Sequence, residues 1–343
     1  MSESATNHTR SFNLGKVDRV RSWLVSSGGR RGALVELFRS AGASRSDQVV
    51  VTDMSQLSAA GHLADAFELV PPVNAPDFLS ESLRIALLHG CTTVIPTIDP
   101  EIMEFASSRE GFRQRGVDVW VSSPEVADLG WDKWAMYKWL RSASFPTMDT
   151  VEVRSFGGEG HFQNLMAKPR SGSASKGVLM PADISDLDFH MLSDDYIVQR
   201  FAPGIEVTVD VAVSAKGQVL ATIPRRRLEV RAGEVSKGVT IKVPAIEELV
   251  RDLVQQLPGA YGILNVQVIY DPETDSSMIL EINPRFGGGY PLSHEAGGDL
   301  IGAMLRSQEG EQVHLQWKPG VVMLRYDTAA YYVDEGYSRL PWQ

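Results

Sequence analysis

The sequence has few of the features that mark secreted, membrane-spanning or nucleic-acid-binding proteins. It contains one cysteine, Cys91, so no disulfide can form within the chain, and a cytoplasmic setting is expected. No apolar run approaches the roughly 20 residues that a membrane-spanning helix needs. Asp and Glu (43) outnumber Lys and Arg (33), and the resulting net charge of −10 argues against a general nucleic-acid binder.

The chain also lacks internal repeats and low-complexity tracts, and its first residues lack the apolar core of a signal peptide. Residues 1–18 are polar and are predicted to form a disordered tail. The 343 residues are enough for two or three domains, and a hydrophobic content of 43% is enough for ordinary globular cores.

Residues 19–122 alternate between short apolar segments and amphipathic helical patterns. Strands are expected in RVRSWLV, QVVVTD, ADAFELV, TTVIPTID and VDVWVSS, and helices in RGALVELFRSAG, FLSESLRIALLHG and PEIMEFASSREGFRQRG. This order predicts a Rossmann-like α/β domain with a parallel sheet covered on both faces. The turn SSGGRRG lacks the G-x-G-x-x-G spacing of dinucleotide sites, so it is either a tight turn or an anion-binding turn.

The rest of the chain is predicted to be α+β. Residues 123–198 begin with a helical stretch that stops at Pro146, followed by a small subdomain with strands in NLMAKPR, VLMP and YIVQRF and a helix near ISDLDFHML. Residues 199–343 are predicted to form a larger subdomain of strands, with a hairpin turn at Lys216-Gly217 and a helix in IEELVRDLVQQL.

The strongest chemical signal is the segment NVQVIYDPETDSSMILEINPRFGGG, which predicts an antiparallel hairpin. Glu281 and Asn283 share one face of its second strand, and Gln267 lies on the first. Oxygen ligands that include a carboxylate suit phosphate-bound Mg²⁺, so these three residues are candidate metal ligands. Arg285 continues the alternation and could stabilise a transferring phosphoryl group. The alternative is a surface hairpin with ordinary polar side chains.

Two lysines and a flexible loop give a second signal. Lys168 ends a predicted strand before the loop SGSASKG, whose backbone amides could fold over phosphates, and Lys133 lies in GWDKWAMYKWL. In YIVQRFAPGIEVTVDV, a Pro-Gly turn joins two strands, and Glu206 could accept hydrogen bonds from ribose hydroxyls. Solvated lysines, a plain connecting loop and an exposed hairpin glutamate are the competing interpretations.

Taken in order, these motifs resemble the ATP-grasp superfamily. They are DK (132–133), KPRSGSASKG (168–177), VQRFAPGIE (198–206), NVQ (265–267) and EINPRFGGGYP (281–291). The likeness spans roughly residues 20–310 and is strongest to the branch of the carbamoyl-phosphate synthetase large subunit and stand-alone amino-acid ligases. It implies an ATP-grasp fold with a pre-ATP-grasp domain, a small lid subdomain and a larger subdomain, with ATP between the last two.

The resemblance also implies roles for individual residues. ATP would be bound by Lys133, Lys168, Ser171, Gly172, Ser173, Ser175, Gly177, Gln199, Arg200, Phe201 and Glu206. Gln267, Glu281 and Asn283 would hold the metal, and Arg285 and Lys168 would be catalytic. The family reaction phosphorylates a carboxylate, and an amine then displaces phosphate. ATP and Mg²⁺ are therefore the expected cofactors, with Mn²⁺ as an alternative metal, and a small carboxylate and an amine are the expected partners.

Substrate recognition is expected beside this site. The segment PRRRLEVRAGEVSKG (224–238) concentrates basic residues, and Arg226 and Arg231 are candidates for binding a substrate carboxylate. Gly288 and His294, in and after the glycine run, are further candidates. A solvated strand and loop is the alternative for the arginines, and a helix-capping role is the alternative for His294.

Two departures qualify the resemblance. Gln267 stands where many relatives have an acidic residue, and the chain ends soon after the core, which favours a stand-alone ligase that could form a homodimer. The competing functions are transfer of an activated carboxylate to a non-amine nucleophile, and nucleotide binding without catalysis. The complete set of candidate phosphate and metal ligands argues against the latter. An NAD-dependent enzyme is disfavoured by the glycine spacing.

Overall fold

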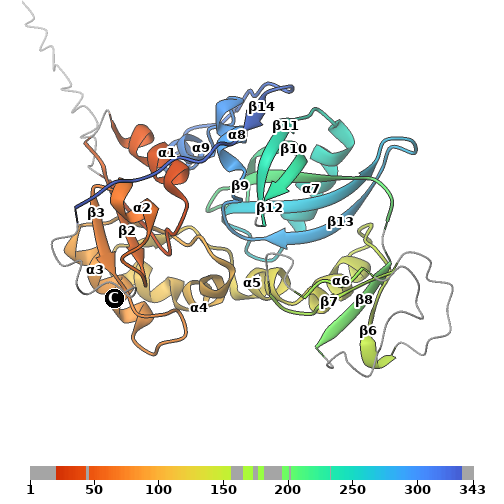
Figure 1. Ribbon diagram of the computed structural model, residues 1–343, viewed down its shortest axis with the longest axis horizontal. Coiled ribbons are helices and arrows are strands. Elements are labelled where there is room, and N and C mark those ends of the chain that lie inside the picture. Colours follow the sequence, from red (N-terminus) through yellow and green to blue (C-terminus); the bar gives the residue numbers. More distant parts are fainter. Residues whose placement is uncertain are drawn as a thin grey trace, which may run out of the picture.

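The computed structural model describes residues 21–43, 46–155, 165–172, 177–180, 195–200, 202–231 and 233–333. Within these ranges the strands form three sheets that follow one another along the sequence (Figure 1). The predictions for residues 1–18, for Ser173, Ser175 and Phe201, and for the helix near ISDLDFHML lie outside the described residues.

The first sheet is parallel, with the order β3-β2-β1-β4-β5. Its strands are β1 (Ser22–Val25), β2 (Gln48–Asp53), β3 (Ala66–Leu69), β4 (Thr93–Ile95) and β5 (Asp118–Val119). Alternate strand residues enter two cores: Trp23 and Val25 pack with α1 (Gly32–Gly42) and α2 (Ala59–Leu63), whereas Leu24 packs with α3 (Phe78–Leu88) and α4 (Asp99–Gln114). The predicted parallel sheet with helices on both faces is confirmed.

Three elements differ from what the sequence predicts: one strand ends earlier, one helix is divided into two, and one predicted strand is only a single bridge. β4 ends at Ile95 because Pro96 cannot donate to the ladder, and Asp99 begins α4 instead of ending the strand. The helical stretch before Pro146 breaks at Asp132 into α5 (Pro124–Trp131) and α6 (Lys133–Ser142), because the Asp132 carboxylate accepts hydrogen bonds from two amides of a new helix. The segment VLMP contributes an isolated bridge between Leu179 and Ala167, with no strand of its own.

The second sheet is small and has the order β6-β8-β7. Its strands are β6 (Thr150–Glu152), β7 (Leu165–Pro169) and β8 (Tyr196–Arg200), and a 3-10 helix, η2 (Val153–Ser155), follows β6. The buried cluster of this sheet in the described residues consists of Val153, Leu165 and Val198. This sheet lies beside α6, at the opposite end of the molecule from the first sheet (Figure 1).

The third sheet has six strands in the order β13-β12-β9-β10-β11-β14. They are β9 (Ile205–Val213), β10 (Val219–Arg231), β11 (Glu234–Thr240), β12 (Gly262–Asp271), β13 (Ser276–Asn283) and β14 (Val322–Leu324). One face packs against α5, α6 and α7 (Pro244–Gln256), and part of the other against α8 (Tyr290–Glu295) and α9 (Leu300–Gln308). None of the described helices is both long and apolar enough to serve as a membrane span.

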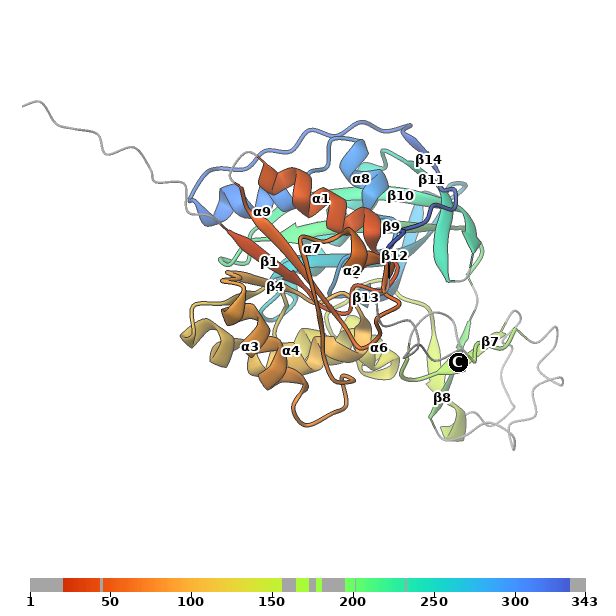
Figure 2. The ribbon, with the colours of Figure 1, turned by 60° about the vertical axis from the view of Figure 1, so that its left-hand side comes forward.

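The first and third sheets share one hydrophobic core through α1, which lies between the first sheet and helices α8 and α9 (Figures 1 and 2). Phe38 of α1 is fully buried, and its ring centroid lies 5.5 Å from Trp23, 6.1 Å from Trp120 and 5.8 Å from Phe286. Because Phe286 follows the predicted metal hairpin, the orientation of that hairpin is coupled to the part of the chain that forms the parallel sheet β3-β2-β1-β4-β5 and its helices, called the first domain below.

Truncation of Phe38 tests this coupling. Phe38→Ala is expected to lower the free energy of unfolding by about 3–5 kcal/mol, because it opens a cavity in a shared core. Leu88→Ala is the control, since Leu88 is 62% exposed and its loss should cost less than about 0.5 kcal/mol. Urea denaturation followed by circular dichroism measures both. Equal stability of the two variants would contradict the shared core.

Candidate active site

A cavity of about 470 Å³ lies where the three sheets meet. Its wall takes residues from the first domain, from α6 and the small sheet, and from the third sheet with the glycine run that follows it. It contains ten of the sequence-predicted site residues: Lys133, Lys168, Ser171, Gly172, Glu206, Gln267, Glu281, Asn283, Arg285 and Gly288.

The β12–β13 hairpin presents its predicted ligands to this cavity. Gln267 pairs directly with Glu281, and Asn265 pairs with Asn283. A bulge at Leu280, between the pairs Val268–Ile279 and Gln267–Glu281, shifts the alternation so that Glu281 joins the cavity face. Among the described residues, the side chains of Gln267, Glu281 and Asn283 form no hydrogen bond or ion pair, so their oxygen atoms remain available to a ligand.

Two lysines face the hairpin from the small sheet and α6. Lys168 of β7 is only 6% exposed, and its pKa is lowered to about 8, chiefly by burial; the charge of Glu281 opposes this shift, and the charge of Lys133 adds a smaller lowering. Lys133 Nζ donates to the Gly172 carbonyl oxygen at 2.7 Å. The first residue of α6 is thus brought to the loop after β7, because Asp132 binds the Arg170 guanidinium through two hydrogen bonds of 2.7 and 2.5 Å.

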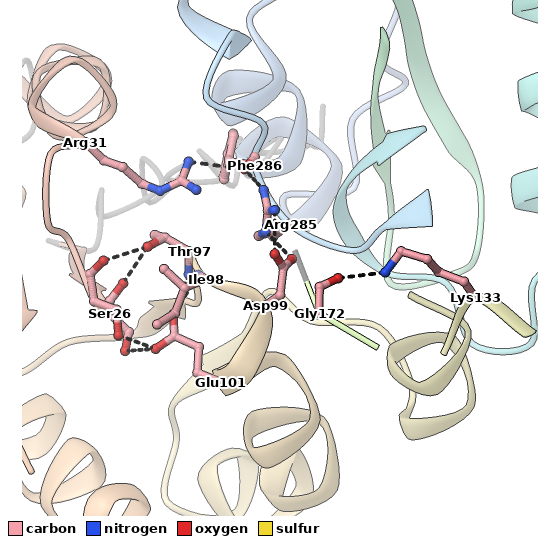
Figure 3. Close-up of polar contacts among 11 residues, drawn as sticks. Ser26, Arg31, Thr97, Ile98, Asp99, Glu101, Lys133, Gly172, Arg285 and Phe286 are labelled. Atoms are coloured by element: carbon pink, nitrogen blue, oxygen red, sulfur yellow. Dashed lines mark hydrogen bonds and ion pairs between the residues drawn. The ribbon is translucent and has the colours of Figure 1, made fainter. Parts of the chain in front are cut away.

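Arg285 joins the third sheet to the first domain (Figure 3). Its guanidinium donates to both carboxylate oxygens of Asp99 at 2.5 and 2.8 Å, and to the Phe286 carbonyl oxygen at 3.1 Å. Burial acts to lower the pKa of Arg285, but the hydrogen bonds and charge of Asp99 outweigh it and raise that pKa. The arginine is therefore a permanently charged group with a fixed orientation at the cavity wall.

The glycine run is explained by close packing against Arg225. The Asp210 carboxylate, fully buried, accepts hydrogen bonds from Arg225 Nε at 2.8 Å, Asn265 Nδ2 at 2.8 Å and Ser293 Oγ at 2.6 Å. A Cβ atom at Gly287 would lie 2.4 Å from Asn265 Nδ2, and one at Gly289 would lie 2.3 Å from Arg225 Nη1. Larger residues at both positions would therefore displace the braced arginine.

On β10, the arginines that face the cavity are not the ones expected from the sequence. Arg225 and Arg227 line the cavity, whereas Arg226 is exposed on the other side of the strand, and Arg231 is 75% exposed beside Asp327. The expected pocket position of Arg226 and Arg231 is thus not found. Arg227 forms a close ion pair with Glu206, so the predicted ribose ligand already has a cationic neighbour.

Four other predicted residues also lie outside the described cavity wall. Gln199 is buried and donates from Nε2 to Thr150 Oγ1 at 3.0 Å, while Arg200 is exposed. Gly177 packs near Pro169, with a backbone φ of +75° that favours glycine. His294 of α8 has Nδ1 3.4 Å from the Tyr290 hydroxyl and 3.7 Å from Asp299.

The sequence left the contribution of the first domain open, because SSGGRRG could be either a tight turn or an anion-binding turn. Arg31, in the turn after β1, and Asp99, at the start of α4 after the neighbouring strand β4, both line the cavity. Behind them, the fully buried Glu101 carboxylate accepts hydrogen bonds from both Ser26 Oγ and Ser27 Oγ at 2.7 Å, and from two backbone amides of the β4–α4 turn (Figure 3). Burial raises the Glu101 pKa against these hydrogen bonds. The position of SSGGRRG and TIDPE at the carboxyl ends of adjacent parallel strands was the available signal.

Two sequence families match the chain. The family described as ATP-grasp domain matches residues 131–289, which include the hairpin, both lysines and the glycine run. Residues 131–289 of the chain are therefore an ATP-grasp domain. A second family, described as PylC-like, N-terminal domain, matches residues 23–120, the parallel-sheet domain. The family and the ATP-grasp fold expected from the sequence are both confirmed, whereas comparison with curated protein sequences gives no match.

Solved structures share this ATP-grasp architecture. N5-carboxyaminoimidazole synthetase from Staphylococcus aureus, complexed with ADP, has a TM-score of 0.68 and 16% identity, covering 90% of this chain and 83% of that one. Carboxyaminoimidazole ribonucleotide synthase from Aspergillus clavatus, complexed with ATP, has a TM-score of 0.66 and 19% identity, covering 84% and 76%. The biotin carboxylase domain dimer of Hydrogenobacter thermophilus 2-oxoglutarate carboxylase, with MgADP, ADP and bicarbonate, has a TM-score of 0.67 and 14% identity, covering 86% and 71%. At these identities the likeness establishes the fold.

The ATP-grasp hairpin has a ligand set that fits a phosphate-bound metal better than a protein-only metal site. The described residues contain no group of three or more His, Cys, Asp or Glu side chains that could hold a metal ion. Glu281, Gln267 and Asn283 supply one carboxylate and two amide oxygens, without protein partners among the described residues. Mg²⁺ commonly takes one or two carboxylates and completes its shell with phosphate and water oxygens.

The lowered pKa of Lys168 generates a pH prediction for this ATP-grasp domain. In the protein without nucleotide, the Lys168 side chain loses its proton as the pH rises through about 8. A bound phosphate favours the charged form of this side chain. Affinity for MgADP is therefore expected to fall by up to about tenfold between about pH 7 and about pH 9. Calorimetric titration should show that the MgADP affinity of Lys168→Arg falls less over this pH range than that of the wild type, because the arginine guanidinium stays charged. The same fall in both proteins would contradict the role of Lys168.

Proposed function

We propose that this protein is an ATP-dependent, ADP-forming ligase that joins a small carboxylate to an amine through an acyl phosphate. The observation that carries the proposal is the set of oxygen donors on the hairpin, Gln267, Glu281 and Asn283, which faces the buried Lys168 across one cavity. Phosphoryl transfer depends mainly on alignment and charge neutralisation, and these groups supply both.

At the nucleotide end, we assign the phosphates to Lys133, Lys168 and the loop that begins at Ser171. Lys133 already contacts this loop through the Gly172 carbonyl oxygen, which supports a common role. The Gln199 side chain is engaged with Thr150, so we assign the nucleobase to the apolar wall of Met148, Met166 and Ile269. Glu206 is assigned to the ribose, with Arg227 fixing its orientation.

At the reacting end, Gln267, Glu281 and Asn283 would hold Mg²⁺, and Mn²⁺ is an alternative metal. The ion, when bound, offsets phosphate charge and orients the phosphate oxygens. Arg285 is held by Asp99 and would stabilise the charge of the transferring phosphoryl group without reorganising. The Gly287–Gly289 backbone and Glu234 form the adjoining wall, where we assign the carboxylate and the amine.

Turnover with panels of substrates tests the reaction class. The protein, ATP and Mg²⁺ are incubated with acids and amines in pairwise combination, and bicarbonate is included among the acids because it is named with the Hydrogenobacter domain. Release of ADP and phosphate that requires both substrates is expected. Release of AMP and pyrophosphate would contradict an acyl phosphate. A homodimer and a cytoplasmic location stay predictions of the sequence.

The metal assignment gives a sharper prediction. Glu281→Ala is expected to lower turnover by about a hundredfold or more, because it removes the hairpin carboxylate that would bind the ion. Glu273→Ala is the matched control, since Glu273 is exposed at the turn of the same hairpin. Circular dichroism confirms that both variants fold. Near-normal turnover by Glu281→Ala would contradict the assignment.

A further inference from the structure

We infer that Arg31 forms a subsite for an oxyanion on the substrate, separate from the carboxylate that is activated. The inference rests on the proposed function and narrows the substrate to an acid, or an acid–amine pair, with a second carboxylate or a phosphate group. It is carried by the distribution of charge along the cavity wall.

The described cavity wall has an excess of positive charge. Seven basic side chains line it, against four acidic ones, an excess of three in a chain whose net charge is −10. Three of the arginines have carboxylate partners: Arg285 with Asp99, Arg227 with Glu206 and Arg225 with Asp210. Among the acidic residues, Glu234 pairs with Arg325, outside the wall. The remaining basic residues are Lys133, Lys168, Arg30 and Arg31.

These four cations form two groups at different ends of the cavity. Lys133 and Lys168 lie at the phosphate end, opposite Glu281. Arg31 approaches from the first domain, and the Arg285–Asp99 pair lies between it and Lys133 (Figure 3). The triphosphate accounts for the two lysines. We therefore assign a different anion to Arg31, which has the exposed Arg30 beside it.

Arg31 is held in place but is not neutralised. Among the described residues it has no carboxylate within ion-pair distance, and its Nη1 donates a hydrogen bond to the Phe286 carbonyl oxygen at 3.3 Å. Burial, together with the nearby charge of Arg285, lowers the Arg31 pKa to about 10, although the charges of Glu234, Asp99 and Glu101 act in the opposite direction. The unfavourable surroundings of this charge would be relieved by an anionic ligand.

The turn that carries Arg31 is rigidly supported, as expected of a binding residue. Ser26 and Ser27 donate to the buried Glu101 carboxylate, and Thr97 Oγ1 donates to the carbonyl oxygens of both serines at 2.9 Å. Arg31 N also donates to the Gly28 carbonyl oxygen at 2.9 Å. A guanidinium on such a support can bind a planar carboxylate or a phosphate through two hydrogen bonds. Arg285 is assigned to the γ-phosphate, so we place the activated carboxylate beside Arg285 and assign a second anionic group of the substrate to Arg31.

The test measures anion binding with the nucleotide site filled. The full-length protein is saturated with Mg²⁺ and β,γ-methylene ATP, and the Kd values of inorganic phosphate and of succinate are measured by calorimetry. Wild type is expected to bind at least one probe. Arg31→Gln should raise that Kd about tenfold or more, and Arg31→Lys should raise it less. The control is Arg39→Gln, because Arg39 is an exposed residue of α1, the helix that follows Arg31, and pairs with Asp65.

The outcomes separate this inference from the proposed function. If β,γ-methylene ATP does not bind wild type, the proposed function fails, and the substrate subsite fails with it. If the nucleotide binds but neither probe does, or if Arg31→Gln and Arg39→Gln give equal Kd values, the subsite alone is overturned. Binding of phosphate but not succinate would identify a phosphorylated substrate, and the reverse would identify one with a second carboxylate.

Discussion

The pairing of β12 with β13 determines which side chains can face the cavity, and the proposed chemistry depends on it. Gln267 lies directly opposite Glu281, which shares a face with Asn283, and the bulge at Leu280 places Ile279 on the opposite face from Glu281. Without the extra residue, the buried Ile279 and Glu281 would share one face. The hairpin thus combines a dry side, packed against the helices, with an oxygen-rich side, within a single two-stranded unit.

The rest of the molecule holds groups against this hairpin from two directions. The small sheet brings the buried Lys168, and the Asp132–Arg170 pair brings Lys133 to the same loop. From the other direction, the first domain is joined to the hairpin by the core around Phe38 and by the Arg285–Asp99 pair. The cavity is consequently a property of the assembled domains, which is why its charges are arranged in two groups along its length.

The hairpin and the side chains that it presents to the cavity could be predicted from the sequence because they depend on local rules. The spacing of two between Glu281 and Asn283, and the turn that fixes the partner strand, contain the necessary information. The inward-facing arginines of β10 could not be predicted in this way. A run of arginines does not show whether Arg225 or Arg226 faces the cavity, because the pairing of β10 with β9 decides it. The Arg285–Asp99 contact spans 186 positions, so only the packing of two domains could show it. Arg31 was visible only as part of a glycine-rich turn with two interpretations.

The most direct measurement is a crystal structure of the full-length protein with β,γ-methylene ATP and Mg²⁺. Oxygen atoms of the Gln267, Glu281 and Asn283 side chains are expected to surround the ion, with Glu281 at about 2.1 Å and the phosphates against Lys168. A magnesium ion bound to the nucleotide but remote from all three hairpin side chains would contradict the account.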